Sequence, residues 1–428
     1  MKDGRNFIVN CLLGRGLPMF GITMFLLTGC GRGFPEFSEV PEAAATSTEG
    51  EAYSDGEKDF ADAESIAAVY EDICREAAKA NVQDSLEVTR RIVAGLGEKG
   101  YVAVDSENQV DMAGAGQVAA FCKAVEENKK DKLTILQVTG RGFRKFDLQT
   151  EGGEVNIIRG YYQYGQNGHL QNRSTAGYRA DVWQYTEEGY LIFEGNYFSE
   201  ENYVLTLSGT SEHTALRVMP LDEKCREWNR KYLLPVGYGQ NNLFLCDWTE
   251  SDYGDLDLYD IFDKFYPVLY GEPVPYGPDA DLTAGTVYMI PEEIFEKVIM
   301  TYFNIDTNTL RSRTNYSPQH GAYEYRPRSF YEAEYPDIPY PEVVGCTENP
   351  DGTVSLMVHA VYPYENTSVS FSHETVLRLL GGERYQYVSN RVISEDGDYD
   401  IRWHSGRLTE EEREELFSNE RVSMRGCQ

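Results

Sequence analysis

The apolar pattern of this sequence changes from a helical period to a strand period near residue 130. From Ile66 to Cys74, apolar residues recur at i, i+3, i+4, i+7 and i+8, which is the stripe of an amphipathic helix. From Leu133 onward, short segments rich in β-formers alternate with glycine-containing turns. Helices followed by consecutive strands predict an α+β fold, with a largely antiparallel sheet and helices on one of its faces.

Capping residues mark the expected helix boundaries. Asp84, with Glu87 three residues later, forms a capping-box pattern that predicts a helix start. Gly95 and Gly97 predict the end of the same helix. Asp111 is expected to cap the helix that follows.

The predicted elements divide the chain into two α+β domains. We expect these domains at residues 61–220 and 221–395, followed by a C-terminal tail, 396–428, with a short helix opened by Thr409 and Glu412. The expected strands of the first domain are 133–139, 143–149, 155–162, 178–185, 191–197 and 203–207. In the second domain we expect helices at 222–231, at 255–266 and after Pro291, and strands at 342–344, 354–362, 368–379 and 385–392.

The N-terminus has the layout of a lipoprotein signal peptide. Three basic residues precede an apolar stretch, 17–27, that is too short to span a bilayer, and Leu27-Thr28-Gly29-Cys30 follows as a processing site. We expect residues 1–29 to be removed and Cys30 to carry lipid such as palmitate on the extracellular side of a bacterial membrane. Residues 30–60 are acidic and lack apolar periodicity, which predicts a disordered tether.

Composition limits the choice of partners. The formal net charge of −31 repels phosphate backbones, so we expect no nucleic acid partner. The chain contains 31 tyrosines. Tyr259, Tyr266 and Tyr270 fall in or just after a predicted helix and could form an exposed strip that stacks on sugar rings or peptide. The alternative, favoured by their helical spacing, is that these rings pack inward.

Cysteine usage leaves the redox state open. No C-x-x-C pair occurs, so the sequence contains neither a zinc ribbon nor a thioredoxin-type motif. In an oxidising compartment the cysteines after Cys30 could form up to three disulfides, or they could be buried thiols. These residues are Cys74, Cys122, Cys225, Cys246, Cys346 and Cys427.

Two resemblances to ligand-binding motifs fail on context. The segment 114–119 fits G-x-G-x-x-A, but a dinucleotide site needs a buried strand directly before it, and 107–112 does not read as one. Asp396, Asp398 and Asp400 are spaced like the start of a calcium loop, but Arg407 stands where the bidentate Glu is required.

Histidines also lack the pattern of a metal site. His373 begins a zinc-protease-like motif, but Leu377 replaces its second histidine. His359 lies opposite the apolar face of its strand, whereas His373 lies on the apolar face of the next strand, so the two cannot face each other. We therefore assign no catalytic residue, no metal ligand and no cofactor.

Several segments between residues 285 and 393 are similar to a family of uncharacterised lipoproteins from Gram-positive bacteria. The resemblance implies a location and a class, and it supplies no catalytic residues. The segments that carry it are Met289–Phe303, Leu310–Tyr316, Asn349–Leu356, Thr375–Arg378 and Tyr385–Arg391.

These observations favour a non-enzymatic, lipid-anchored binding or accessory protein of the cell envelope. Its expected partners are the membrane, through the lipid on Cys30, and an envelope protein or glycan. One alternative is a hydrolase that acts on envelope glycan or peptide through two dispersed carboxylates. A second alternative is the solute-binding subunit of a transporter.

The anchor prediction can be tested by replacing Cys30 with Ala. Without the thiol that carries the lipid, the variant should leave the membrane pellet of fractionated cells, because no other apolar stretch of the sequence is long enough to span a bilayer. Retention of Cys30→Ala in the pellet to the same extent as the parent would contradict the prediction.

Overall fold

The computed structural model describes residues 56–165, 168–199, 203–204, 207–277, 286–393 and 401–416. The predicted signal peptide, Cys30, the acidic residues 396–400 and Cys427 lie outside the described residues. The first described helix, α1, begins at Gly56, inside the segment that the sequence assigned to the tether, and Phe60 packs against the core. No helix in the described ranges is both long and apolar enough to cross a bilayer.

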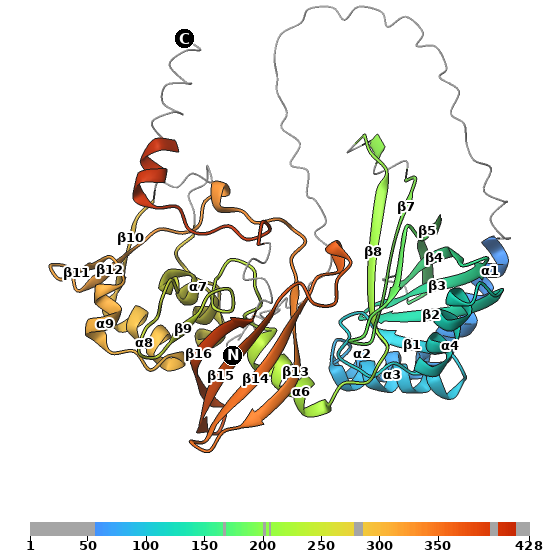
Figure 1. Ribbon diagram of the computed structural model, residues 1–428, viewed down its shortest axis with the longest axis horizontal. Helices are drawn as coiled ribbons and strands as arrows, with labels where there is room; N and C mark the ends of the chain where they lie inside the picture. The colour runs from blue at the N-terminus through green and yellow to red at the C-terminus, as the bar shows by residue number, and fades with distance from the viewer. Residues whose placement is uncertain are drawn as a thin grey trace, which may run out of the picture. The chain divides into compact units, whose positions relative to one another are not determined.

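The first half of the structure contains a five-stranded sheet, β1-β2-β3-β4-β5, and a three-stranded sheet, β6-β7-β8 (Figure 1). Its helices are α1 (Gly56–Ala68), α2 (Glu71–Ala80), α3 (Leu86–Glu98) and α4 (Ala115–Glu126). Its strands are β1 (Val102–Asp105), β2 (Asp131–Thr139), β3 (Gly142–Glu151), β4 (Glu154–Tyr164), β5 (Leu170–Arg179), β6 (Val182–Tyr185), β7 (Tyr190–Tyr197) and β8 (Thr210–Arg217). The α+β class is confirmed, with helices interspersed among mostly antiparallel strands.

Helices cover both faces of the five-stranded sheet, so the expectation of helices on one face is wrong. Ala103 faces the cluster formed by α1, α2 and α3, whereas Val102 and Val104 face α4 and the strands β7 and β8. The side chains alternate because successive residues of a strand point to opposite faces. The sheet is therefore buried between two layers.

The sequence analysis missed strand β1, which changes the topology. β1 pairs in parallel with β2, and α4 connects them, so this part is a βαβ unit. Four residues in strand conformation are too few to show an alternating pattern. Asp105, at the end of β1, is buried and accepts hydrogen bonds from the backbone N–H groups of Gln109 and Val110, at 2.9 and 2.8 Å.

Several predicted boundaries shift in the structure. The cap of α3 is Ser85 rather than Asp84, and the helix continues through both glycines to Glu98. Gly114 caps α4, while Asp111 forms an ion pair with Arg226, at 2.6 Å. The predicted strand 178–185 divides between β5 and β6 in different sheets, and residues 203–204, predicted as strand, are helical.

The second half contains the sheets β13-β14-β15-β16-β9 and β10-β12-β11. Its helices are α6 (Glu223–Trp228), the π-helix η1 (Asn229–Leu233), α7 (Leu258–Tyr270), α8 (Glu292–Tyr302) and α9 (Thr307–Ser312), with 3-10 turns η2 (Phe330–Glu332) and η3 (Pro363–Glu365). Its strands are β9 (Trp248–Thr249), β10 (Tyr288–Pro291), β11 (Tyr316–Ser317), β12 (Ala322–Tyr325), β13 (Tyr340–Glu348), β14 (Thr353–Val361), β15 (Ser372–Gly381) and β16 (Arg384–Ile393).

A buried ion pair joins the two halves. Arg217, at the end of β8, donates to Glu342 on β13 at 2.8 Å, and both side chains are almost fully buried. Tyr190 donates a further hydrogen bond to Glu342 at 2.7 Å. Burial raises the pKa of Glu342, while Arg217 acts in the opposite direction. The contact ties the first half to the edge strand of the larger sheet of the second half.

Residues 401–416 are packed against the second half. Trp403 is 3% exposed and belongs to the core. The predicted capping box is confirmed, because the Thr409 N–H donates to Glu412 at 2.8 Å and the Glu412 N–H donates to Thr409 Oγ1 at 3.2 Å. The cap begins a helix at residues 410–416. This part of the predicted tail is therefore an ordered component of the fold.

His373 lies in the core of the second half, at 0% exposed. It pairs across the sheet with Val358, while His359 pairs with Ser372, so the two histidines lie on opposite faces as predicted. The Tyr238 hydroxyl donates to Nε2 of His373 at 3.0 Å. Nδ1 of His373 donates to the side-chain oxygen of Asn390, Oδ1, at 2.9 Å. Burial lowers the pKa of His373 to about 3, although the hydrogen bond to Asn390 acts in the opposite direction.

This burial predicts a pH-dependent loss of stability. In the unfolded chain His373 takes up a proton below about pH 6.5, whereas the folded protein excludes that proton until about pH 3. The contribution of neutral His373 to the free energy of unfolding is fully present above pH 6.5. As the pH falls toward 3, this contribution is lost by up to about 1.4 kcal/mol per pH unit. Urea unfolding measured at several pH values between 6 and 4 gives the free energy of unfolding at each pH. We expect this free energy to fall more steeply with decreasing pH in the parent than in His373→Gln. The exposed His320, replaced by Gln, is the control, and equal slopes for the parent and His373→Gln would contradict the prediction.

Candidate functional site

Three aspartates lie three residues apart at the start of α7. Asp257 caps the helix by accepting hydrogen bonds from the N–H groups of Tyr259 and Asp260, at 2.9 and 3.0 Å. Asp260 and Asp263 follow one turn and two turns later. Residues at this spacing share one side of a helix, so their carboxylates point to the same region of the structure.

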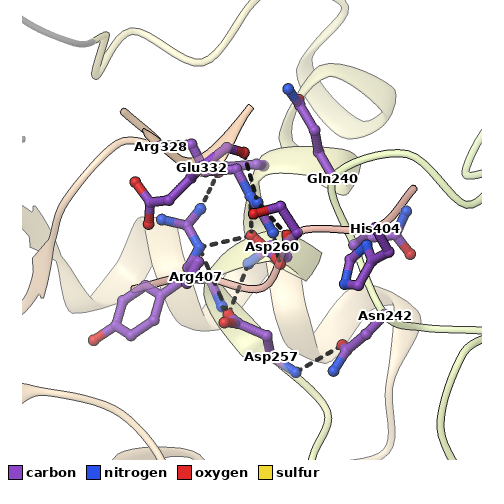
Figure 2. Close-up of polar contacts among 12 residues, drawn as sticks. Gln240, Asn242, Asp257, Asp260, Arg328, Glu332, His404 and Arg407 are labelled. Carbon is purple, nitrogen blue, oxygen red and sulfur yellow. Dashed lines mark hydrogen bonds and ion pairs between the residues drawn. The ribbon is translucent and has the colours of Figure 1, made fainter. Parts of the chain in front are cut away.

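Asp260 is the centre of a buried ion network (Figure 2). The residue is 2% exposed. Arg328 binds its carboxylate through two hydrogen bonds, Nε to Oδ1 at 3.0 Å and Nη2 to Oδ2 at 2.6 Å. Arg407 Nε donates to the same Oδ1 at 2.6 Å. Two guanidinium groups thus neutralise one carboxylate, which is what a charge removed from water requires.

Arg407 extends the network to the other two aspartates. Its Nη2 donates to Asp263, and its Nε lies 3.8 Å from Asp257. Tyr325 donates to the other oxygen of Asp263 at 2.6 Å. Burial raises the pKa of Asp263 to about 6, although Arg407 acts in the opposite direction. Burial alone would lower the pKa of Arg407, but its three aspartate neighbours raise it, so the guanidinium remains charged.

Glu332 binds the segment that contains Arg407 and Arg413. Its fully buried carboxylate accepts hydrogen bonds from the Ser329 N–H at 2.6 Å, the Leu408 N–H at 2.9 Å and Arg413 Nη2 at 2.8 Å. Burial alone would raise the pKa of Glu332, but the hydrogen bonds from the Ser329 and Leu408 backbones lower it. The carboxylate therefore stays ionised and fixes the segment that carries Arg407 and Arg413.

A pocket of about 250 Å³ lies beside this network. Three arginines and three carboxylates contribute to its wall. Its lining residues are Asp257, Tyr259, Asn315, Glu324, Arg326, Arg407, Leu408, Thr409, Glu410 and Arg413. The volume is just below the range of about 300–1,000 Å³ for ligand pockets, so only a small polar molecule would fit.

Arg413 lines the pocket and has one guanidinium nitrogen without a hydrogen-bond partner. The residue is 5% exposed, and its Nη1 is buried without a hydrogen-bond partner. The neighbouring arginines are already engaged, because Arg326 binds Glu410 through two hydrogen bonds and Arg407 binds the aspartates. Burial lowers the pKa of Arg413, and Arg326 acts in the same direction, while Glu332 opposes them. An anion bound at Nη1 would offset this unfavourable environment.

The carboxylates of the pocket can accept hydrogen bonds from the same ligand. Burial and the nearby Asp260 raise the pKa of Asp257, against the effect of Arg407. Glu324, on strand β12, is exposed to solvent. An anionic group at Arg413, with N–H or O–H donors directed at Asp257 or Glu324, would match the charges of the wall.

The tyrosines singled out in the sequence lie in an internal aromatic cluster. Tyr266 is buried, and Tyr259 and Tyr270 are half-buried against the core. The Tyr259 ring packs on Phe295, and its hydroxyl accepts a hydrogen bond from the Asn315 N–H at 2.8 Å. These rings do not form an exposed strip, because α8 and β12 supply partners for them. Tyr259 alone of the three lines the pocket, and ligand binding by the three stays a prediction.

The sequence analysis missed every charged residue of this site. Asp257, Asp260 and Asp263 carry a visible signal in their spacing, but Arg328 and Arg407 lie far along the chain and have no local signature. Arg407 was considered only as the residue that disqualifies a calcium loop. Within the described ranges no cluster of three or more His, Cys, Asp or Glu side chains is arranged to hold a metal ion.

Comparison with known proteins places this chain in a family. The chain belongs to a family of unknown function, DUF6070, whose model matches residues 56–407. The match begins with α1 and ends at Arg407, so it includes the aspartates of α7 and excludes Arg413. No curated protein and no solved structure matches the chain. The family membership supplies no activity.

Removal of Arg407 should destabilise the second half strongly. Arg407→Leu removes the cation of the half-buried Asp263 and one of the two cations that bind the buried Asp260, and loss of one partner from a buried pair costs about 3–5 kcal/mol. Urea unfolding of the full chain measures the loss. The control is Arg391→Leu, which breaks an exposed ion pair with Glu374 and should cost less than about 1 kcal/mol. Equal losses in the two variants would show that the network is not a major source of stability.

Proposed function

We propose that this chain is a lipid-anchored protein of the cell envelope that binds a small carboxylate in the pocket beside Arg413. Two observations carry the proposal: Arg413 lines the pocket, and its buried Nη1 has no hydrogen-bond partner. The N–H groups of a charged guanidinium form strong hydrogen bonds with a carboxylate oxygen, and Nη1 of Arg413 is the nitrogen that has no other partner. The function is that of a binding or accessory protein rather than an enzyme.

The geometry of the pocket supports a rigid binding site. The backbone that carries Arg407 and Arg413 is held by Glu332 and by the buried Asp260 network. A donor that is already positioned loses little conformational entropy when its ligand binds. The aspartate and glutamate side chains of the wall restrict the ligand to carboxylates that also carry hydrogen-bond donors, such as amino acids, short peptides or sugar acids.

The signal-peptide layout and the processing site before Cys30 support the location. The segment between Cys30 and α1 would then place the domain outside a Gram-positive membrane, where wall peptides and glycans are the available carboxylates. The family match is compatible with this proposal, and the resemblance noted in the sequence points to the same location.

The hydrolase alternative draws on the same pocket. Asp257, whose pKa is raised by burial, and Glu324 are both in its wall. Catalysis by two carboxylates requires one of them to stay protonated while the other is ionised. Asp257 Oδ1, however, is occupied by the cap of α7, and Arg407 lies beside it. These contacts favour binding over proton transfer.

Calorimetric titration of the full chain tests the proposal. The probes are alanyl-alanine and glucuronic acid, which combine a carboxylate with N–H or O–H donors, and inorganic phosphate serves as a competing anion. We expect at least one carboxylate to bind and Arg413→Lys to weaken that binding by about tenfold to a hundredfold, because the Nη1 donor is lost. The lysine retains a cation for Glu332, so the fold is expected to persist.

Arg311→Lys is the matched control. Arg311 makes ion pairs with Glu292 and Glu296 outside the pocket, so this variant should bind like the parent. Equal affinity in the parent and Arg413→Lys, or no binding of either carboxylate, would contradict the proposal. Binding of phosphate alone would show an anion site without preference for carboxylates.

A further inference from the structure

Helix α6 lies along strand β13, and two contacts define the alignment. Lys224 Nζ donates to Glu348 Oε1 at 2.9 Å, and Asn229 Nδ2 donates to the Pro341 carbonyl oxygen at 2.9 Å. The helix and the strand therefore run in opposite directions past each other. Cys225, next to Lys224, is brought beside the strand residues just before Glu348, where Cys346 is found.

The two thiols belong to the same core region. Cys346 contributes to the raised pKa of Cys225, as expected for neighbouring thiols. Cys225 is 4% exposed and belongs to the core, while Cys346 is half-buried and packs against the same core. Burial raises the pKa of Cys225 to about 11, and Cys346 acts in the same direction, so Cys225 is a neutral thiol in the reduced protein.

The other described cysteines have no such partner. Cys74 and Cys122 lie in the first half, and Cys246 lies elsewhere in the second half. Burial raises the pKa of each, and the charges that add to this effect belong to carboxylates rather than to another thiol. Among the described cysteines with a shifted pKa, Cys225 is therefore the one whose pKa is raised by a second thiol.

We propose that Cys225 and Cys346 are a disulfide-forming pair, which closes when the protein meets a low-molecular-weight disulfide outside the cell. The Cys346 thiolate, which is the more accessible, attacks one sulfur of the oxidant and releases a first thiol. Cys225 then loses its proton and attacks the Cys346 sulfur, which releases a second thiol. The protein gives up two electrons and two protons, and the oxidant disulfide is reduced to two thiols.

Neither Cys225 nor Cys346 lines the pocket, so a disulfide between them would not touch the proposed ligand. The disulfide would close a loop of about 120 residues that contains α7 with its three aspartates, whereas Arg407 and Arg413 lie outside that loop. Cross-linking of a long loop mainly restricts the unfolded chain. The oxidised protein should therefore be more stable than the reduced protein, and binding at Arg413 should be unchanged. The inference stands independently of the proposed ligand.

Peptide mapping of the full chain tests the pair. The reduced protein is incubated with oxidised glutathione at neutral pH, its remaining thiols are blocked, and it is denatured and digested. We expect a peptide that joins Cys225 to Cys346, together with a rise in the thermal unfolding midpoint that dithiothreitol reverses. Cys225→Ser should lose both effects, and Cys122→Ser, which also replaces a buried cysteine, should retain them.

The parent protein alone decides the outcome, so the test does not depend on the folding of the serine variants. Two results would overturn the proposal. One is a stable glutathione adduct on Cys346 with Cys225 still available for alkylation after denaturation. The other is a linkage of either residue to a different cysteine in place of the Cys225–Cys346 peptide.

Discussion

The contact between Arg407 and the aspartates of α7 is the interaction on which the second half depends. Asp260 is buried, and its charge is tolerated because Arg328 and Arg407 both bind it. Neither arginine is close to Asp260 in sequence, so only the tertiary fold brings the three side chains together. Burial of the Asp260 carboxylate is unfavourable unless cations pair with it, and Arg328 and Arg407 provide that pairing.

The same network shapes the pocket. Arg407 is held by Asp260 and Asp263, and Glu332 binds both the Leu408 backbone and Arg413. The segment 401–409 therefore cannot move away from α7 without breaking these charge pairs. Arg328 and Arg407 donate hydrogen bonds from every guanidinium nitrogen, whereas Nη1 of Arg413 has no hydrogen-bond partner. The same ion pairs thus stabilise the second half and position the residues of the proposed binding site.

The prediction from sequence succeeded where the signal was local. Strands β14 and β16, the capping box at Thr409 and the opposite faces of His359 and His373 all follow from side-chain periodicity and capping chemistry. It failed where a long-range contact decided the outcome. Strand β1 is only four residues long and pairs in parallel across α4, and Arg407 forms its contacts with residues nearly 150 positions away.

The sequence by itself determined the α+β class and most of the strands. These depend on the local spacing of apolar, capping and small residues, which a single chain displays directly. The tertiary structure alone decided that helices cover both faces of the first sheet and that Arg407 joins three aspartates. Burial and charge pairing arise between segments that are distant in sequence, and they become defined only when packing brings those segments together.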